Sequence, residues 1–340
     1  MATIGQRYLD LIDLYKREDR NRDIAVIIEL LAQTNSILDD AIAIECNNGT
    51  SHRTTVRTGL PAVTWGQLYK GIPQSKSTTA QVEDATGFVE GLSTVDQRLL
   101  EISKGPNRVR LTEAQGFLES LSQEVATTIF YGDVTADPTK FTGLSARFSD
   151  PTAPNGGQLV DGGGTGSNNT SVWFVTWGDR QCHLLYPEGT RAGITREDKG
   201  QQRVVDGDGD AYYAMEELFR WHVGLTVRDW RFVSRICNID VDDLKAGTVD
   251  IYGLFRQAFW KLRSHRVMGG RQAIYCNADV LEALDAAATP TVATSGGSAS
   301  SFVRLTPQNI DGREVLTYRG IPVRQCDALL NTEAAISFPS

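Results

Sequence analysis

The clearest pattern of apolar and polar positions in this chain lies between residues 112 and 131. Apolar side chains recur there at spacings of three and four, which is typical of one buried helix face, at Ala114, Phe117, Leu118, Leu121, Val125, Thr128 and Ile129. Thr112 and Gln115 have the spacing of a capping box, and Gly132 can adopt a left-handed turn at the end. The pattern predicts a helix of about 19 residues, roughly 28 Å long.

The part before this helix has two different characters. Residues 5–44 show helical spacing, with apolar faces that fit either a small bundle or an arm without a partner in its own chain. Residues 46–103 are rich in Thr, Ser and Gly with short alternation, which predicts an extended two-stranded hairpin. An isolated hairpin is marginally stable in water, and this one has too few apolar residues for a core. We therefore expect a neighbouring subunit of an assembly to hold it.

The part after the helix mixes strands and helices. Residues 150–171 are dense in Gly, Pro, Asn and Ser and predict a long loop. Apolar runs and alternation predict strands at residues 172–177, 182–186, within 218–236, at 271–276, 314–318 and 321–330. Helical spacing predicts helices at 248–264 and 278–288, followed by a loop at 289–301. The expected fold class is α+β; the pattern does not define the strand order of the middle part, and a rearranged topology is compatible with it.

Length and charge narrow the class of protein. A chain of 340 residues can form one large or two modest domains. No run of about 18 apolar residues and no secretory signal is visible, so we expect a soluble protein made in a cytoplasm. The net charge of −8 argues against a protein whose main task is to grip nucleic acid through its phosphates. It does not argue against a surface that encloses nucleic acid.

Cysteine, histidine and glycine patterns offer little chemistry. An odd number of cysteines without a CxxC pair favours reduced, mostly buried thiols over disulfides or zinc, and these are Cys46, Cys182, Cys237, Cys276 and Cys326. No metal or nucleophile motif contains a histidine, so a structural or surface role is expected for His52, His183, His222 and His265. The glycine-rich residues 161–167 lack the Gly-Lys pair of a phosphate loop and predict a flexible loop.

One acidic segment resembles a calcium loop. Asp206, Asp208, Asp210 and Glu217 occupy positions one, three, five and twelve of such a loop, and carboxylate oxygens are the ligands that calcium prefers. Position six is Ala211 where the loop needs glycine, and no helix pattern precedes it, so a solvated acidic turn is the preferred interpretation. The sequence therefore predicts no catalytic, cofactor-binding or metal-binding residues. A metal-dependent enzyme that uses these four carboxylates is the alternative from a different class.

The order of these parts resembles the major capsid proteins of tailed phages, which have the Hong Kong 97-type fold. The nearer likeness is to those of short-tailed phages. The resemblance rests on the order of motifs that are individually weak: Leu60-Pro61 with Trp65 and Gly71, residues 75–79, the helix that ends at Gly132, Phe141-Thr142-Gly143-Leu144, Gly320-Ile321-Pro322-Val323-Arg324 and residues 327–330. It implies a shell subunit that forms pentamers and hexamers and closes an icosahedral head around double-stranded DNA, without enzymatic activity.

The resemblance also assigns the parts of the chain. It implies an N-terminal helical arm at residues 1–45, an E-loop at 46–103, a spine helix with the approach to the A-domain at 104–148, a glycine-rich loop and β-rich P-domain or insertion at 149–247, and an A-domain at 248–340. Because the chain begins almost directly at its arm, a separate scaffolding protein is expected, together with a portal protein and a decoration protein as further partners. The shell would enclose DNA without sequence-specific binding, would not involve a membrane, and would be assembled in the bacterial cytoplasm. A cellular encapsulin-like nanocompartment is the alternative with the same fold.

Overall fold

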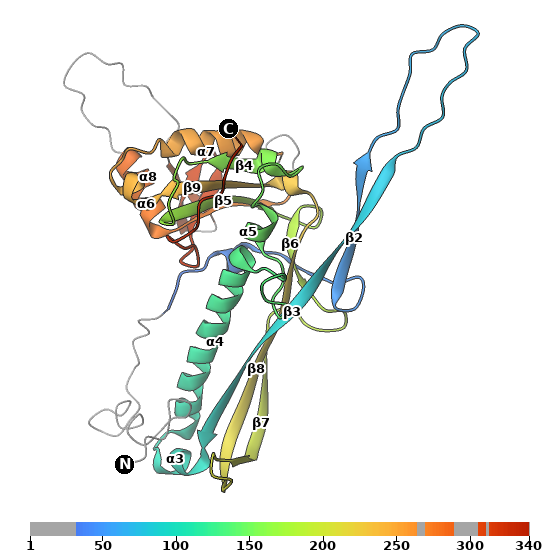
Figure 1. Cartoon of the computed structure of the whole chain (residues 1–340). Coiled ribbons are helices and arrows are strands. Elements are labelled where there is room, and N and C mark those ends of the chain that lie inside the picture. Colours follow the sequence, from blue (N-terminus) through green and yellow to red (C-terminus); the bar gives the residue numbers. More distant parts are fainter. Residues whose placement is uncertain (1–31, 264–268, 289–304, 311–312, 340) are drawn as a thin grey trace, which may run out of the picture.

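The computed structural model describes residues 32–263, 269–288, 305–310 and 313–339. Figure 1 shows a compact upper part, a long helix α4 (Pro106–Tyr131) that runs down from it beside a β ribbon, and a hairpin that projects away from both. Most of the predicted arm, residues 1–31, lies outside the described residues. Among the described residues of this range, the helical prediction is confirmed for the single turn α2 (Ile37–Asp40). It is wrong at its end, where β1 (Ala43–Glu45) is a strand.

Helix α4 begins earlier than the apolar pattern indicates. Gly105 precedes it, and Pro106 occupies its first position, where a backbone N–H would have no helical partner. Thr112 lies inside the helix and donates to the carbonyl oxygen of Arg108 at 2.9 Å, so the predicted capping box with Gln115 is wrong. The helix has 26 residues and is about 39 Å long at 1.5 Å per residue.

The glycine after α4 is needed for a different reason than predicted. Gly132 has φ −56° and ψ 134°, which is not a left-handed conformation. A Cβ at this position would collide with the carbonyl oxygen of Phe141 and would lie 2.7 Å from that of Thr128. Gly143 donates its N–H to the carbonyl oxygen of Gly132 at 2.8 Å, because the following chain folds back against the end of the helix. The close approach of two backbone segments explains the glycine.

The strands form one mixed sheet. Its main path has the order β11-β12-β13-β10-β5-β6-β8-β3-β2, and β1, β4, β7 and β9 pair with strands of that path or with each other. The strands of the compact part are β4 (Leu159–Asp161), β5 (Asn169–Trp177), β6 (Cys182–Tyr186), β9 (Val233–Asp240), β10 (Arg271–Cys276), β11 (Thr306–Ile310), β12 (Arg313–Tyr318) and β13 (Ile321–Gln325). Strands β3 (Thr78–Asp96), β7 (Ile194–Val205) and β8 (Ala211–Val227) form the antiparallel ribbon beside α4. Strand β10 is parallel to β13 and antiparallel to β5, so the sheet is mixed. Together with the helices, this confirms the predicted α+β class.

Predicted and observed elements agree best in the compact part. Strands β5, β6 and β10 and the helices α7 (Ile251–Lys261) and α8 (Ala278–Ala288) lie where periodicity places them. The pattern missed β7, β11 and the short helix α3 (Gln97–Ile102). Residues 150–171 are not one loop, because they contain η1 (Gly156–Gln158), β4 and the start of β5, with both Leu159 and Val160 buried. The predicted loop at 289–301 lies outside the described residues.

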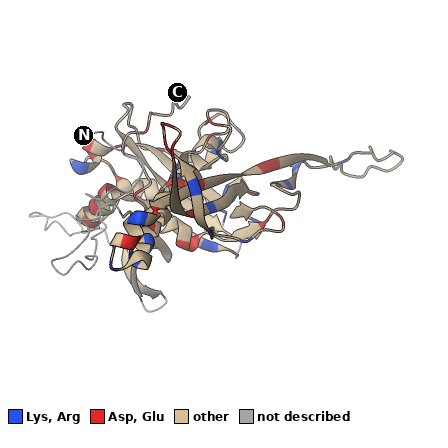
Figure 2. Ribbon diagram, turned by 90° about the horizontal axis from the view of Figure 1, so that it is seen from below, with Lys and Arg blue, Asp and Glu red and all other residues tan. Residues whose placement is uncertain are grey.

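The sheet of the compact part has a core on each face. Helices α6 (Val241–Lys245), α7 and α8 contribute to the core on one face, where Phe174 of β5 meets Phe255 of α7 with 5.3 Å between ring centroids. The end of α4 and the short helix α5 (Leu144–Arg147) cover the other, where Phe130 packs near Trp173. No helix in the described parts of the chain is long and apolar enough to cross a membrane. Acidic and basic residues are interspersed in the view of Figure 2.

Candidate assembly site

The projecting hairpin carries the most exposed apolar group of the described chain. Strands β2 (Ser51–Gly59) and β3 pair from Ser51 with Ala85 to Gly59 with Thr78, which confirms the predicted extended pairing. The segment between them, residues 60–77, is the tip. Six large apolar side chains of the tip are each at least 80% exposed: Leu60, Val63, Trp65, Leu68, Tyr69 and Ile72. Six large apolar side chains so fully exposed on one short segment indicate an interaction site, because burying them against another surface is favourable.

A buried polar cluster holds the root of the hairpin. The backbone pairing of β3 with β8 ends at Thr86 and Gly224, and beyond this point side chains make the connection. Asp84 of β3 accepts hydrogen bonds from Arg147 of α5 at 2.7 Å and from Thr226 of β8 at 2.5 Å. Arg147 also donates to the carbonyl oxygen of Leu225 at 3.0 Å. Asp84 is 6% exposed, so loss of Arg147 would leave a buried carboxylate without its counter-charge, which is costly.

Two histidines belong to the same root. His52 of β2 and His183 of β6 are buried, and their rings meet edge to face with 5.7 Å between centroids. Burial lowers the pKa of both, that of His183 to about 4. The other two histidines are elsewhere: His222 lies beside Phe88 on the ribbon, and His265 lies outside the described residues. The local sequence could not predict this contact between His52 and His183, because β2 and β6 are far apart in the chain and come together only in the folded structure.

The four carboxylates of the calcium alternative are not brought together. Asp206, Asp208 and Asp210 lie in the turn between β7 and β8, where Asp206 accepts the backbone N–H groups of the other two at 3.1 and 2.9 Å. Glu217 lies six residues along β8 from Ala211, which places it about 20 Å from the turn at 3.4 Å per residue. No group of three or more metal-binding side chains that could hold an ion occurs in the described ranges. The metal alternative is therefore wrong for these residues.

Glu217 instead ties the ribbon to α4. It is 3% exposed and forms ion pairs with Arg110 of α4 and with Arg196 of β7, the latter at 2.7 Å. Arg110 also pairs with Asp198 at 2.8 Å, directly opposite Glu217 in the strand register. Further along, Phe117 of α4 stacks on Phe219 of β8 with 5.7 Å between centroids. The helix and the ribbon therefore form one rigid unit.

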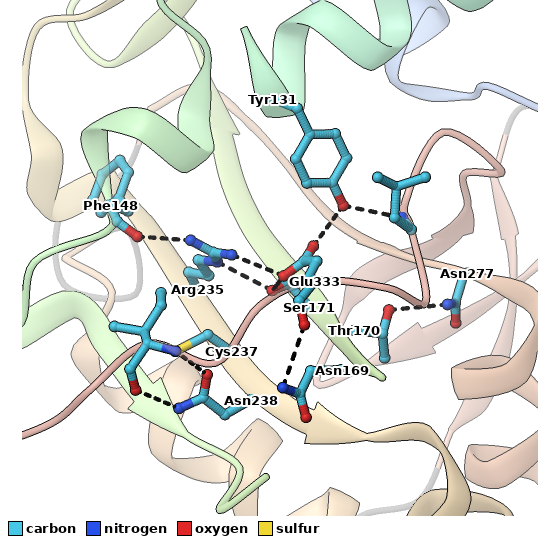
Figure 3. A network of polar contacts seen from close by, with 12 residues as sticks. Tyr131, Phe148, Asn169, Thr170, Ser171, Arg235, Cys237, Asn238, Asn277 and Glu333 are labelled. Atoms are coloured by element: carbon cyan, nitrogen blue, oxygen red, sulfur yellow. Dashed lines mark hydrogen bonds and ion pairs between the residues drawn. The ribbon is translucent and has the colours of Figure 1, made fainter. Parts of the chain in front are cut away.

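A second buried network joins α4 to the compact part and to the C-terminal segment (Figure 3). Arg235 of β9 and Glu333 form an ion pair at 2.8 Å, with side chains 5% and 6% exposed. Tyr131, the last residue of α4, donates to Glu333 Oε1 at 2.5 Å. Ser171 of β5 donates to Glu333 Oε2, the oxygen that pairs with Arg235. Arg235 also donates to the carbonyl oxygen of Phe148 at 2.9 Å. Burial and the adjacent Glu333 carboxylate raise the pKa of Tyr131, which keeps its hydroxyl a donor.

The cysteines are free and buried, as predicted. Burial raises the pKa of Cys46 to about 11 and that of Cys182 to about 12. A thiol in such surroundings is a small apolar side chain rather than a nucleophile. The described residues thus present a projecting apolar tip, two rigid connections and no assembled catalytic cluster, which defines a class of subunit that is completed by contacts with other chains.

Comparison with known proteins identifies that class. The family described as Major capsid protein GP7 matches residues 19–337. The structure of bacteriophage Epsilon15, derived from cryo-electron microscopy and modelling, is similar with 32% identity and a TM-score of 0.78, covering 99% of each chain. The chain belongs to the GP7 family of tailed-phage major capsid proteins. It is a structural subunit of the icosahedral phage capsid shell with an α+β Hong Kong 97-like fold, it is not an enzyme, and its place is the virion capsid.

More distant structures share less of the chain. A capsid of a native GTA particle matches at 12% identity with a TM-score of 0.44, covering 66% of this chain and 96% of the other. The holo-SrpI encapsulin complex from Synechococcus elongatus matches at 12% identity with a TM-score of 0.42, covering 68% and 97%. No curated protein matches this chain significantly. The expected likeness to short-tailed phages agrees with the Epsilon15 match, and the family assignment favours a phage shell over a cellular nanocompartment.

Proposed function

We propose that residues 46–103 act as an E-loop that lies on an adjacent subunit within pentamers and hexamers of the shell. The observation that carries this proposal is the tip, where six large apolar side chains are at least 80% exposed at the end of a projecting hairpin. A contact of this kind joins unlike surfaces of neighbouring copies, and such head-to-tail contacts close into rings. The shell built from these rings encloses double-stranded DNA.

The other parts receive matching roles. Residues 1–45 act as an N-terminal arm, and residues 104–148 contain the spine helix α4 with the approach to the A-domain. Residues 149–247 include the P-domain ribbon of β7 and β8, and residues 248–340 form much of the A-domain around the capsomer axis. The rigid connections at Glu217 and at Arg235 support this division, because they let α4 hold the ribbon and the compact part in one orientation. Scaffolding, portal and decoration proteins are the further partners predicted from the resemblance.

The test removes the apolar tip while leaving the fold intact. In Trp65→Ser/Tyr69→Ser, the loss of two aromatic side chains that the contact would bury should weaken each contact by about 3–6 kcal/mol. The matched control is Thr64→Ser/Gln67→Ser, which changes polar residues of the same tip. Each variant is expressed with the neighbouring genes of its phage, and particles are examined by electron microscopy and sedimentation velocity. We expect shells from the control and only small species from the aromatic variant, with unchanged circular dichroism. Normal shells from the aromatic variant, and from a chain whose residues 60–77 are replaced by a short Gly-Ser turn, would contradict the proposal.

A further inference from the structure

The root of the hairpin contains a pair of buried histidines in an arrangement that protonation would disturb. His183 Nδ1 lies 3.2 Å from the carbonyl oxygen of Gly178, which makes Nδ1 the protonated nitrogen and leaves Nε2 as a bare acceptor. His183 Nε2 and His52 Nδ1 are both buried without a hydrogen-bond partner. A neutral ring tolerates this, since only a lone pair is left unsatisfied. A second proton on either ring would add a buried N–H donor and a positive charge.

The charges around the pair do not compensate for such protonation. Asp84 of β3 lies opposite His52 in the strand register and raises the pKa of that ring, but burial outweighs it and Arg147 and Thr226 already occupy its two oxygens. Arg228, which follows β8, lowers the pKa of both histidines, whereas Asp179, in the turn between β5 and β6, raises them and is itself paired with Arg228 at 3.2 Å. The thiol of Cys182, which interacts with Arg147 and Asp84, is buried and neutral. Two imidazolium rings would therefore repel each other and Arg228.

The hairpin has few backbone bonds to the body at this position: its pairing with β8 ends, and the Glu188 N–H donates to the carbonyl oxygen of Gly49, just before β2, at 2.9 Å. Strand β8 continues past Gly224 in pairing with β6, through His183 opposite Thr226, while β3 leaves β8 after Thr86. From that point β2 and β3 pair only with each other among the described strands. The contact of His52 with His183 holds β2 against β6, next to the Asp84 cluster that holds β3. A change of charge at this contact would act directly on the angle of the hairpin.

We infer that the His52–His183 pair is an acid-sensitive latch that holds the hairpin at one angle while both rings are neutral and releases it when they are protonated. The closed root binds fewer protons than an open root, because burial lowers the pKa of both rings. Acid therefore favours the open root, and above about pH 6.5 the ratio of the two forms does not change with pH. For His183 alone, a pKa of about 4 when closed and about 6.5 when open shifts the ratio about 30-fold toward the open form between pH 8 and pH 5. His52 acts in the same direction.

The latch can be tested on the unassembled, full-length subunit, so its failure would not be confused with failure of the proposed tip contact. Nitroxide labels are attached to Gln81→Cys on β3 and Gln115→Cys on α4, two exposed positions. The five native thiols are buried and will not compete for the label. Pulsed electron paramagnetic resonance then measures the distance distribution between the labels from pH 8 to pH 4.5, with near-ultraviolet circular dichroism to verify that the compact part stays folded.

We expect one narrow distribution at pH 8 and a second, separate population that grows below pH 6. In His52→Gln/His183→Gln the distribution should not change with pH, whereas the control His222→Gln should respond as the unmodified protein does. An unchanged narrow distribution down to pH 4.5, or the same acid response in the double variant, would overturn the latch. If the double variant does not fold, nuclear magnetic resonance of labelled histidine in the unmodified subunit decides the question. The latch requires two histidines with pKa values well below 6.5 that titrate together with the distance change.

Discussion

Replacing Glu333 by Gln tests how strongly the C-terminal segment fastens α4 to the compact part. The substitution keeps the shape of the side chain and removes its charge, which leaves the guanidinium of Arg235 buried at 5% exposure without a counter-charge. Removing one partner of a buried ion pair costs about 3–5 kcal/mol, because the remaining charge stays out of water. At roughly 2 °C per kcal/mol for a chain of this size, the Tm should fall by about 6–10 °C.

The assay is thermal unfolding of the unassembled subunit at neutral pH, followed by near-ultraviolet circular dichroism. This signal is suitable because the guanidinium of Arg235 lies 4.9 Å from the ring centroid of Trp173, so loosening of the network changes the surroundings of an aromatic ring. Glu124→Gln is the matched control. Its carboxylate pairs with Lys140 at 2.7 Å, but the two side chains are 46% and 40% exposed, so the loss should not exceed about 1 kcal/mol.

A double variant separates the free energy lost with the attraction from the cost of the unpaired buried charge. In Arg235→Met/Glu333→Leu no buried charge remains, and at least half of the loss of the single variant should be recovered. Equal Tm values for Glu333→Gln and Glu124→Gln would refute the view that burial makes the Arg235 pair strong. A double variant that is less stable than Glu333→Gln would show that the hydrogen bonds of Arg235 to Phe148 and Ser171, rather than its charge, determine the effect.

Two further predictions concern the glycine after α4 and the buried cysteines. Gly132→Ala should lower stability by roughly 2 kcal/mol or more, since its Cβ meets two backbone oxygens. Gly116→Ala, inside α4 with open space around the added Cβ, should raise stability by about 0.5–1 kcal/mol. Equal effects of the two substitutions in a thermal-shift comparison would exclude the close-approach argument. A thiol reagent at pH 8 should modify essentially none of the five cysteines of the native subunit and all of them in denaturant. The reason is that burial raises the pKa of every thiol. Rapid labelling of the native protein would contradict the burial.

Local sequence patterns predicted the elements better than the contacts between them. The hairpin could be predicted because its alternation is regular and its apolar residues are too few for a core. The start of α4 was misplaced because the apolar stripe begins after Thr112, although Pro106 is itself a recognised signal for the first turn. Strand β7 was missed because most of its side chains are exposed, so no alternation between buried and exposed positions marks it.

The buried polar clusters could not be predicted, because they join residues that are distant in the chain. Tyr131 and Glu333 are separated by 202 positions, and Asp84 and Thr226 by 142. Nothing in the sequence next to these residues marks them as partners, and only the folded sheet brings them together. Glu217 illustrates the opposite error, since its spacing from three aspartates suggested a ligand set, while the strand register points it toward Arg110 and Arg196. Spacing predicts a site only when the intervening chain forms the loop that the spacing assumes.

The unbroken sheet has a mechanical consequence. Strand β3 is 19 residues long and pairs with β2 at one end and with β8 at the other, so the hairpin and the ribbon share one continuous backbone. A pull on the tip is directed along β3 and loads the successive bonds between β3 and β8 in shear, where they resist together rather than opening one at a time. The same pull reaches β6 through β8 and then β5 in the compact part. A force on the tip therefore spreads along one hydrogen-bonded sheet into the compact part of the subunit.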